Sequence, residues 1–363
     1  MSKRPRPRST SGTSATAKPP RIKTEPLTLE HSFKSGAPYE TTPASLRTTL
    51  AREGVAYVAG VLSAEECVAM VDEMWGFFEQ LTREWPTPLR RDAPDTWPGY
   101  FKLFPMHNML HQHWRIGHAA FVWAVRSNPR VAAVFATLWG LPSAEELLVS
   151  FDGVAFHLPP ERVGGRGKYA QGGPGWFHTD QRLCDSSEQC FQGWVTGLDV
   201  RPGDATLTVL RGSHAYHAEF AARFGYSASG KADWHKLANQ EELDFFVREK
   251  GCERVAICCP AGSLVLWDSR TMHAGQEPLL VRPEPNIRCI VYVCYVPRTR
   301  ATPKQLAKKR AAFEAMRMTS HWPEKVKLFG KQPRTYGAEL PAVTEVVTQP
   351  PQLTPLGRRL AGY

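Results

Sequence analysis

Apolar residues recur every three or four positions over residues 64–82, with polar residues between them. This spacing is typical of an amphipathic helix with one buried face. Ser63 precedes the run and Glu65 and Glu66 open it, which predicts a helix capped by Ser63 and ending near Thr82. The predicted buried face carries Val68, Met70, Val71, Met74, Phe77, Phe78 and Leu81.

Two further segments of the N-terminal part have helical signals. Residues 118–140 are periodic, with a break and restart at Ser127-Asn128-Pro129. Residues 42–50 open with Thr42-Pro43, which predicts Thr42 as the cap because proline is favoured in the first helical turn. We therefore expect a helical part over residues 42–146.

Residues 147–297 have the pattern of short strands instead of helices. Short runs of β-branched and aromatic residues alternate with Gly and Pro turn signals, and a polar insertion over residues 215–250 is expected to be helical in part. Many short strands without regular strand–helix alternation favour an antiparallel sandwich or jelly roll over a parallel α/β sheet. The predicted strands are 147–151, 154–158, 176–180, 194–200, 206–210, 255–259, 264–267 and 287–296.

The two ends of the chain differ from this body. Residues 1–41 hold almost no large apolar residues and are predicted to be a disordered basic tail. Residues 298–363 are predicted to form a basic helical extension and a loosely packed tail. The predicted fold is α+β with a mostly β core, a sandwich or jelly roll over residues 147–297 inside a domain spanning residues 42–297, flanked by N-terminal helices and a basic C-terminal helix.

The net charge of +10 is unevenly distributed. Residues 1–25 hold seven Lys and Arg against one Glu, and residues 298–334 hold eleven against two, so the body between them is mildly acidic. This argues against a polyanion-binding surface over the whole protein, but leaves nucleic-acid contact open through the tail and residues 298–334. The patch KRPRPR at residues 3–8 resembles a nuclear-import signal and equally fits a solvated tail.

Two absences bear on location. No apolar run approaches membrane-spanning length, so no membrane span is expected. The eight Cys form no C-x-x-C pair and no dense framework, which favours an intracellular protein with reduced thiols, nuclear or otherwise cytoplasmic.

The candidate chemistry lies in the β-rich part. His178 and Asp180 are two residues apart on a predicted strand, so their side chains point to the same face. His273 follows far downstream beside another predicted strand. Two imidazoles and one carboxylate are the protein ligands of the facial triad that holds non-haem Fe(II). Arg288 opens the last predicted strand, where a guanidinium can bind the distal carboxylate of a dicarboxylate in bidentate fashion.

Other clusters are weaker candidates. His107 and His111 have the helical spacing of zinc ligands, but the Glu of the H-E-x-x-H motif is missing between them, which favours packing or substrate contact. His217-Ala218-Glu219 falls in a predicted helix and receives no role. The glycine-rich residues 164–175 are expected to form a flexible lid.

These residues resemble a known family. The block GDATLTVLRGSH at residues 203–214 is similar to the strand–turn segment of phytanoyl-CoA dioxygenase-like Fe(II)/2-oxoglutarate oxygenases, and EGVAYVAGVLS at residues 53–63 is similar to their opening segment. The remaining features follow the family in order: His178-x-Asp180, Gly262-Ser263-Leu264 through Trp267, His273 and Arg288. The resemblance covers residues 44–297.

The resemblance implies a double-stranded β-helix that uses Fe(II), 2-oxoglutarate and O2. It implies roles by position: His178, Asp180 and His273 as iron ligands, Arg288 as the 2-oxoglutarate anchor, and Trp194 or Thr196 lining the same pocket. Family members often carry a hydroxyl two residues beyond the distal His, where this chain has Gly275. The implied reaction converts 2-oxoglutarate to succinate and CO2 and hydroxylates a substrate C–H bond.

Several functions stay open at this stage. A small organic or lipid-like substrate is favoured, and a modified nucleobase is the second option. An enzyme that oxidises a nucleobase would need a basic groove beside the iron and a pocket for a flipped base, and the sequence shows neither. A non-catalytic jelly-roll binding module is one alternative. A cupin-like metalloenzyme that does not use 2-oxoglutarate is another, and Arg288 is the residue that separates it from a 2-oxoglutarate enzyme.

Overall fold

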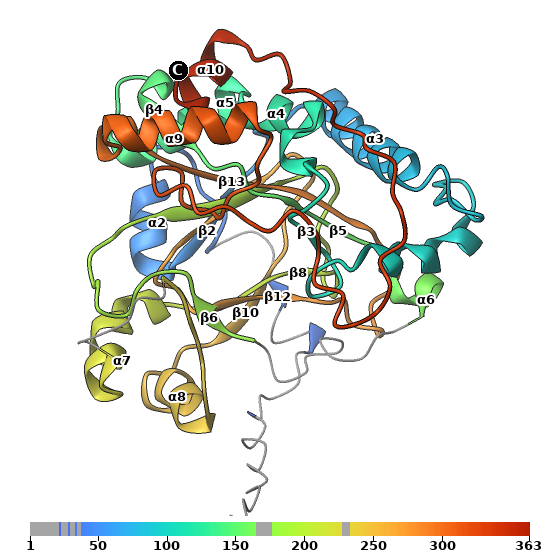
Figure 1. Ribbon diagram of the computed structural model, residues 1–363. Coiled ribbons are helices and arrows are strands. Elements are labelled where there is room, and N and C mark those ends of the chain that lie inside the picture. The colour runs from blue at the N-terminus through green and yellow to red at the C-terminus, as the bar shows by residue number, and fades with distance from the viewer. Residues whose placement is uncertain (1–21, 23–27, 30–32, 35–37, 165–175, 227–232) are drawn as a thin grey trace, which may run out of the picture.

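A computed structural model of the chain describes residues 22, 28–29, 33–34, 38–164, 176–226 and 233–363 (Figure 1). The import patch at residues 3–8, most of the predicted tail at residues 1–41 and all of the predicted lid 164–175 except Gly164 lie outside the described residues. Within the described part of the chain, no helix is long and apolar enough to cross a bilayer.

The strands form two sheets that are antiparallel except where β1 pairs with β10. The first sheet has the order β1 (Phe33–Lys34), β10 (Arg254–Ile257), β8 (Thr206–Leu210), β12 (His273–Gln276), β6 (His178–Thr179) and β9 (His235–Lys236). The second has the order β2 (Val55–Val58), β11 (Leu264–Asp268), β7 (Phe191–Thr196), β13 (Arg288–Pro297), β5 (Val154–His157) and β3 (Leu110–His111), and β4 (Leu147–Val149) pairs with the end of β13.

Successive strands change sheets along the chain. β10 and β12 lie in the first sheet, whereas β11 and β13 lie in the second. Figure 1 shows the second sheet between a layer of helices and the first sheet. The predicted mixed class with antiparallel sheets is confirmed, and the strand at 194–200 proves to begin earlier, at Phe191.

Apolar side chains fill the space between the sheets. Trp194 of β7 and Ile290 of β13 face inward from the second sheet and meet Leu207, Val209, Val255 and Ile257 of the first. The other face of the second sheet, with Val195 and Val291, packs against the helices. Burial on both faces explains why β11, with the sequence LVLWD, is an almost continuous apolar run instead of an alternating one.

The main covering helix is α3 (Ala64–Leu81). Its predicted capping box is confirmed: Ser63 Oγ accepts from the Glu66 amide at 3.2 Å, and Glu66 Oε2 accepts from the Ser63 amide at 2.7 Å. Trp75 and Phe78 are almost fully buried, and each large apolar side chain contributes about 1.5–3 kcal/mol. The prediction for Val68 was wrong, because it lies on the solvent side and is 60% exposed.

The predicted break in residues 118–140 is confirmed. Helix α4 (Ala120–Arg126) ends before Ser127, and α5 (Pro129–Trp139) restarts with Asn128 as its cap. The predicted cap Thr42 was wrong, because residues 42–45 form a turn in which the Ser45 amide donates to the Thr42 carbonyl at 3.1 Å. Helix α2 (Leu46–Glu53) therefore begins one turn later.

The insertion at residues 215–250 is partly helical, as predicted. It contains α7 (His217–Arg223), β9, α8 (Gln240–Asp244) and a π-helical turn at Phe245–Glu249, packed through Phe220 and Phe246. Shorter helical turns occupy Pro94–Leu103, Ile116–His118, Ala144–Glu146, α6 (Pro160–Val163), Ser213–Tyr216 and Arg298–Arg300.

The C-terminal extension packs back onto the body. Helix α9 (Pro303–Glu314) starts with a capping box formed by Thr302 and Gln305. The chain then runs across the front of the molecule past β13, β3 and β5 and returns to α10 (Pro355–Ala361), beside α9 (Figure 1). Leu360 is fully buried, so the last residues differ from the loosely packed tail that was expected.

Candidate metal centre

The three predicted ligand residues come together on two neighbouring strands of the first sheet. His178 of β6 and His273 of β12 are directly opposite each other in the antiparallel pair, and Asp180 follows the end of β6. The candidate ligand atoms of the three side chains all lie within 4.8 Å of one another. Asp180 Oδ2 is 3.7 Å from His178 Nε2 and 3.5 Å from His273 Nε2. This is the spacing of ligands around one small cation.

Backbone carbonyls fix the orientation of both imidazoles. His178 Nδ1 lies 3.1 Å from the Trp176 carbonyl, and His273 Nδ1 lies 2.9 Å from the Thr271 carbonyl. A ring nitrogen that donates to a carbonyl carries the proton, which leaves the lone pair on Nε2 free for a metal. Both Nε2 atoms therefore face Asp180 and are the ring nitrogens available to a metal.

The carboxylate is held in the charged form. Burial alone would raise the pKa of Asp180, but the neighbouring imidazoles of His178, His321 and His273 outweigh it and hold that pKa well below its usual range. Burial, together with the nearby His178, lowers the pKa of His273. A neutral imidazole and an ionised carboxylate are the states that bind metal, so this donor set fits Fe(II).

Two further contacts hold Asp180 in place. Gln192 Nε2 donates to Asp180 Oδ2 at 2.9 Å, and the Asp180 amide donates to the Ser269 carbonyl at 3.1 Å. The Asp180 side chain keeps 22% of its surface exposed, whereas His178 and His273 are buried. The site is therefore open on the Asp180 side.

Aromatic rings stack against the candidate ligands. Trp176 lies nearly parallel to His178 with centroids 4.4 Å apart, and His107 also stacks on Trp176 at 3.8 Å. Trp267 of β11 is 5.3 Å from the ring of His273, so the centre faces the space between the sheets. The packing interpretation of the His107 cluster holds, because His111 is buried and its Nε2 lies 2.6 Å from the Tyr100 hydroxyl.

Arg288 begins β13 in the opposite sheet and is buried. Its guanidinium lies over Trp194 at 5.5 Å and interacts with Tyr292, but Nε and Nη1 are buried without a hydrogen-bond partner within the described structure. Buried donors normally have partners, so two orphaned N–H groups on a cation fit an absent carboxylate. The cofactor 2-oxoglutarate carries such a group.

The other predicted pocket residues lie on the same face of the second sheet. Trp194 is opposite Tyr292, and Thr196 is opposite Ile290, in the β7–β13 pair. The hydroxyl of Thr196 donates to the Leu198 carbonyl at 2.6 Å, so its proton is already used in a hydrogen bond within the following turn. Gly275 places no side chain beside the centre, and a Cβ there would lie 3.7 Å from Trp176.

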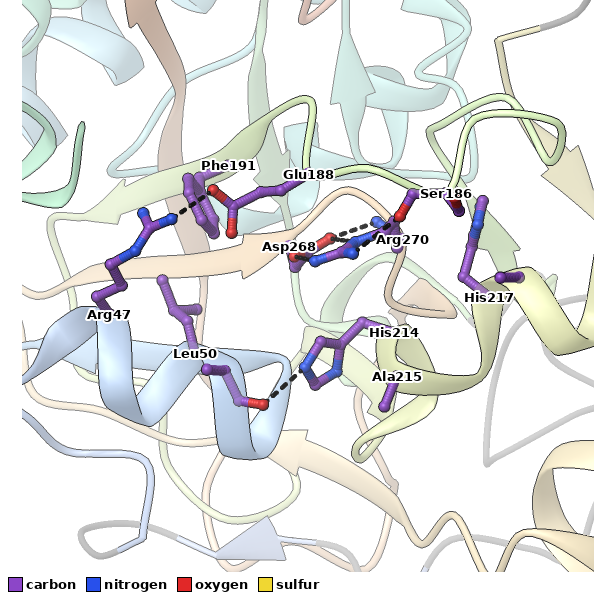
Figure 2. Close-up of a pocket in the computed structure, with 12 residues that line it drawn as sticks. Arg47, Leu50, Ser186, Glu188, Phe191, His214, Ala215, His217, Asp268 and Arg270 are labelled. Atoms are coloured by element: carbon purple, nitrogen blue, oxygen red, sulfur yellow. Dashed lines mark hydrogen bonds and ion pairs between the residues drawn. The ribbon is translucent and has the colours of Figure 1, made fainter.

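A separate cavity of about 330 Å³ lies away from the triad (Figure 2). Arg270 donates to both oxygens of Asp268, at 2.9 and 2.6 Å, on its wall. This pair shapes the turn around Ser269, whose carbonyl accepts from Thr179 Oγ1 at 2.7 Å and from Asp180. The Asp268–Arg270 pair is therefore linked to the metal centre through the Ser269 carbonyl. The cavity contains His217, which lies in α7 as predicted and takes no part in the triad.

The sequence profile of the phytanoyl-CoA dioxygenase (PhyH) family matches residues 50–277. The chain belongs to this family. Phytanoyl-CoA dioxygenases use Fe(II) and 2-oxoglutarate, so these are the cofactors that the centre accommodates. The match contains His178, Asp180 and His273 but stops before Arg288 and the C-terminal extension.

Individual relatives are more distant. "Ava biosynthesis cluster protein O" of Aspergillus versicolor is 30% identical over 224 residues, which cover 59% of this chain and 66% of that protein. Hypothetical protein JW0805 of Escherichia coli shares the fold with a TM-score of 0.52 and 14% identity, covering 90% of this chain and 85% of that one. The epimerase SnoN, solved with Fe3+ and alpha ketoglutarate, has a TM-score of 0.42 and 17% identity, covering 70% and 83% of the two chains.

Proposed function

We propose that this member of the phytanoyl-CoA dioxygenase family is an Fe(II)- and 2-oxoglutarate-dependent hydroxylase of a small organic molecule. The observation that carries the proposal is the triad within 4.8 Å, combined with the orphaned guanidinium of Arg288 on the facing sheet. The alternation of strands between two sheets supports the predicted double-stranded β-helix, whose open end would hold the site.

Each residue receives a role from its surroundings. His178 and His273 present Nε2 to the metal because their Nδ1 atoms are tied to carbonyls, and Asp180 supplies the anionic ligand. Arg288, whose guanidinium lies over Trp194, would donate through Nε and Nη1 to the distal carboxylate of 2-oxoglutarate. When bound, Fe(II) and 2-oxoglutarate supply the oxidising chemistry, and the stacked Trp176 shields one side of the centre from water.

The interactions of the basic residues in segment 298–334 favour a small-molecule substrate over a nucleobase. Most basic residues of segment 298–334 fold onto the protein itself: Arg298, Arg300, Arg310 and Arg317 donate to backbone carbonyls, Lys309 is buried, Lys325 lies on Trp322, and Lys327 pairs with Asp233. Cations used in this way are poorly available for phosphates, which are the main source of nucleic-acid affinity.

The test is anaerobic and needs no substrate. Fe(II) and then 2-oxoglutarate are added to the wild type, to Asp180→Ala and to Arg288→Gln, and the visible charge-transfer band of the chelated keto acid is recorded. We expect the band in the wild type, no band in Asp180→Ala, and a band that needs far more 2-oxoglutarate in Arg288→Gln. An iron-loaded wild type without a band would favour the cupin-like alternative, and a folded wild type that takes up no iron would favour a non-catalytic module.

A further inference from the structure

The C-terminal extension carries a histidine to the metal centre. After α9 the chain is fixed to the body at Thr319, whose amide donates to the Phe151 carbonyl at 2.9 Å and whose hydroxyl accepts from the Phe151 amide at 3.0 Å. Thr319 also bridges to Leu328, so residues 319–328 form a closed loop. His321 lies in this loop.

The imidazole of His321 approaches a candidate ligand. Its Nδ1 is 3.9 Å from Asp180 Oδ2, longer than a hydrogen bond but short enough for direct electrostatic contact. Its Nε2 is buried and has no hydrogen-bond partner among the residues that the structure describes. The ring packs on Trp322 at 4.9 Å, and Trp322 is buried against Cys190 and Cys294. The side chain is therefore held at the site by packing.

Acidic groups surround this histidine. It interacts electrostatically with Asp180, with the buried Asp152 and with Asp233, which come from three separate segments. Lys327 of the same loop pairs with Asp233 at 2.6 Å. Asp233 lies two residues before β9, which pairs with β6, the strand of His178. The loop is therefore linked to the metal centre through Asp233 as well as through its approach to Asp180.

We propose that His321 is a positioning residue of the metal centre, which holds the Asp180 carboxylate together with Gln192. The inference rests on the proposed function, because it requires that the triad binds Fe(II). Gln192 already donates to Oδ2, and a second donor restricts rotation of the carboxylate about its Cβ–Cγ bond. A shift of about 1 Å brings His321 Nδ1 into hydrogen-bond range. The family match ends at residue 277, so this contact is supplied by the chain's own extension.

The experiment measures Fe(II) affinity without 2-oxoglutarate or turnover, by anaerobic competition with a chromogenic chelator. His321→Leu removes both nitrogens. His321→Asn keeps an N–H at the position of Nδ1, and His321→Gln moves it to the position of Nε2. The control is His113→Leu, because His113 contacts the same extension at the Gly330 carbonyl, at 3.3 Å, and is not among the groups around Asp180.

Loss of a residue that orients a metal ligand weakens metal binding about 10- to 100-fold, which is the expected result for His321→Leu. His321→Asn should recover most of the affinity, His321→Gln less, and His113→Leu should match the wild type. The inference is overturned if His321→Leu binds Fe(II) within twofold of the wild type, if Asn is as weak as Leu, or if His113→Leu loses as much. A wild type that binds no Fe(II) would overturn the proposed function as well, so the two failures are distinguishable.

Discussion

Arg288 links the stability of the free protein to its proposed cofactor. Its Nε and Nη1 are buried without partners within the described structure, and an unsatisfied buried donor costs about 1–3 kcal/mol. Arg288→Met fills a similar volume without donors. The Tyr292 side chain loses its interaction with the guanidinium, which offsets part of the gain. We expect the free energy of unfolding of the metal-free protein to rise by about 1 kcal/mol.

The same substitution should damage cofactor binding. Two charge-assisted hydrogen bonds to a carboxylate contribute roughly 1.5–3 kcal/mol each, so their loss weakens 2-oxoglutarate binding by about 10²- to 10⁴-fold. Urea unfolding of the metal-free protein gives the first quantity. Anaerobic titration of the iron-loaded protein with 2-oxoglutarate, followed by the charge-transfer band, gives the second.

Arg254→Met is the matched control. Arg254 is a second mostly buried arginine, but it donates to Gln276 Oε1 at 2.8 Å, so its removal should lower stability by about 1 kcal/mol and leave 2-oxoglutarate binding unchanged. The reasoning is refuted if Arg288→Met binds 2-oxoglutarate within threefold of the wild type, or if it is less stable than Arg254→Met.

Three further outcomes are expected. Burial lowers the pKa of Lys309 to about 7, so the unfolded chain holds more protons than the folded one between pH 7 and its ordinary pKa, and stability rises with pH in that window. Between pH 7 and pH 9, the free energy of unfolding measured with urea should increase by about 2 kcal/mol more in the wild type than in Lys309→Met. An equal increase in both proteins would contradict the lowered pKa of Lys309. Ser63→Ala removes the cap of α3 and should cost about 1 kcal/mol of unfolding free energy with unchanged Fe(II) affinity; a loss below 0.3 kcal/mol would show that the cap is dispensable. Gln192→Met should weaken Fe(II) binding about tenfold at unchanged secondary structure, as measured by chelator competition, and unaltered affinity would remove Gln192 from the site.

The sequence predicts local features well where one segment carries the whole signal. The helix after Ser63 has its cap, its acidic first turn and its periodic face within twenty residues, and its bounds were predicted closely. The pairing of His178 with Asp180 followed from strand periodicity, which needs only neighbouring positions. Thr42 was wrong as the cap because the helical hydrogen-bond ladder begins only at Ser45, whose carbonyl accepts from the Thr49 amide at 3.0 Å. The Thr42 hydroxyl accepts from the Ser45 amide at 3.3 Å in the turn before the helix.

Features that depend on distant segments were missed. Gln192 lay outside the strand predicted at 194–200, so its contact with Asp180 had no visible signal. His321 received no role in the sequence analysis, because nothing in the order of residues relates the extension to Asp180. Trp176 could have been found, since it lies two residues before His178 and therefore on the same face of the strand.

The direct opposition of His178 and His273 has a mechanical consequence. β6 has only two residues in its ladder, and one of them is the partner of His273. A metal bound across this pair would act as a cross-link between segments far apart in the chain. It would pin the register of β6, which pairs with β12 at a single residue, against β12, which is also paired with β8 over four residues. Iron loading would then slow amide hydrogen exchange along β6 and β12. A shift of β6 by one residue against β12 would move His178 away from His273 and abolish the metal site.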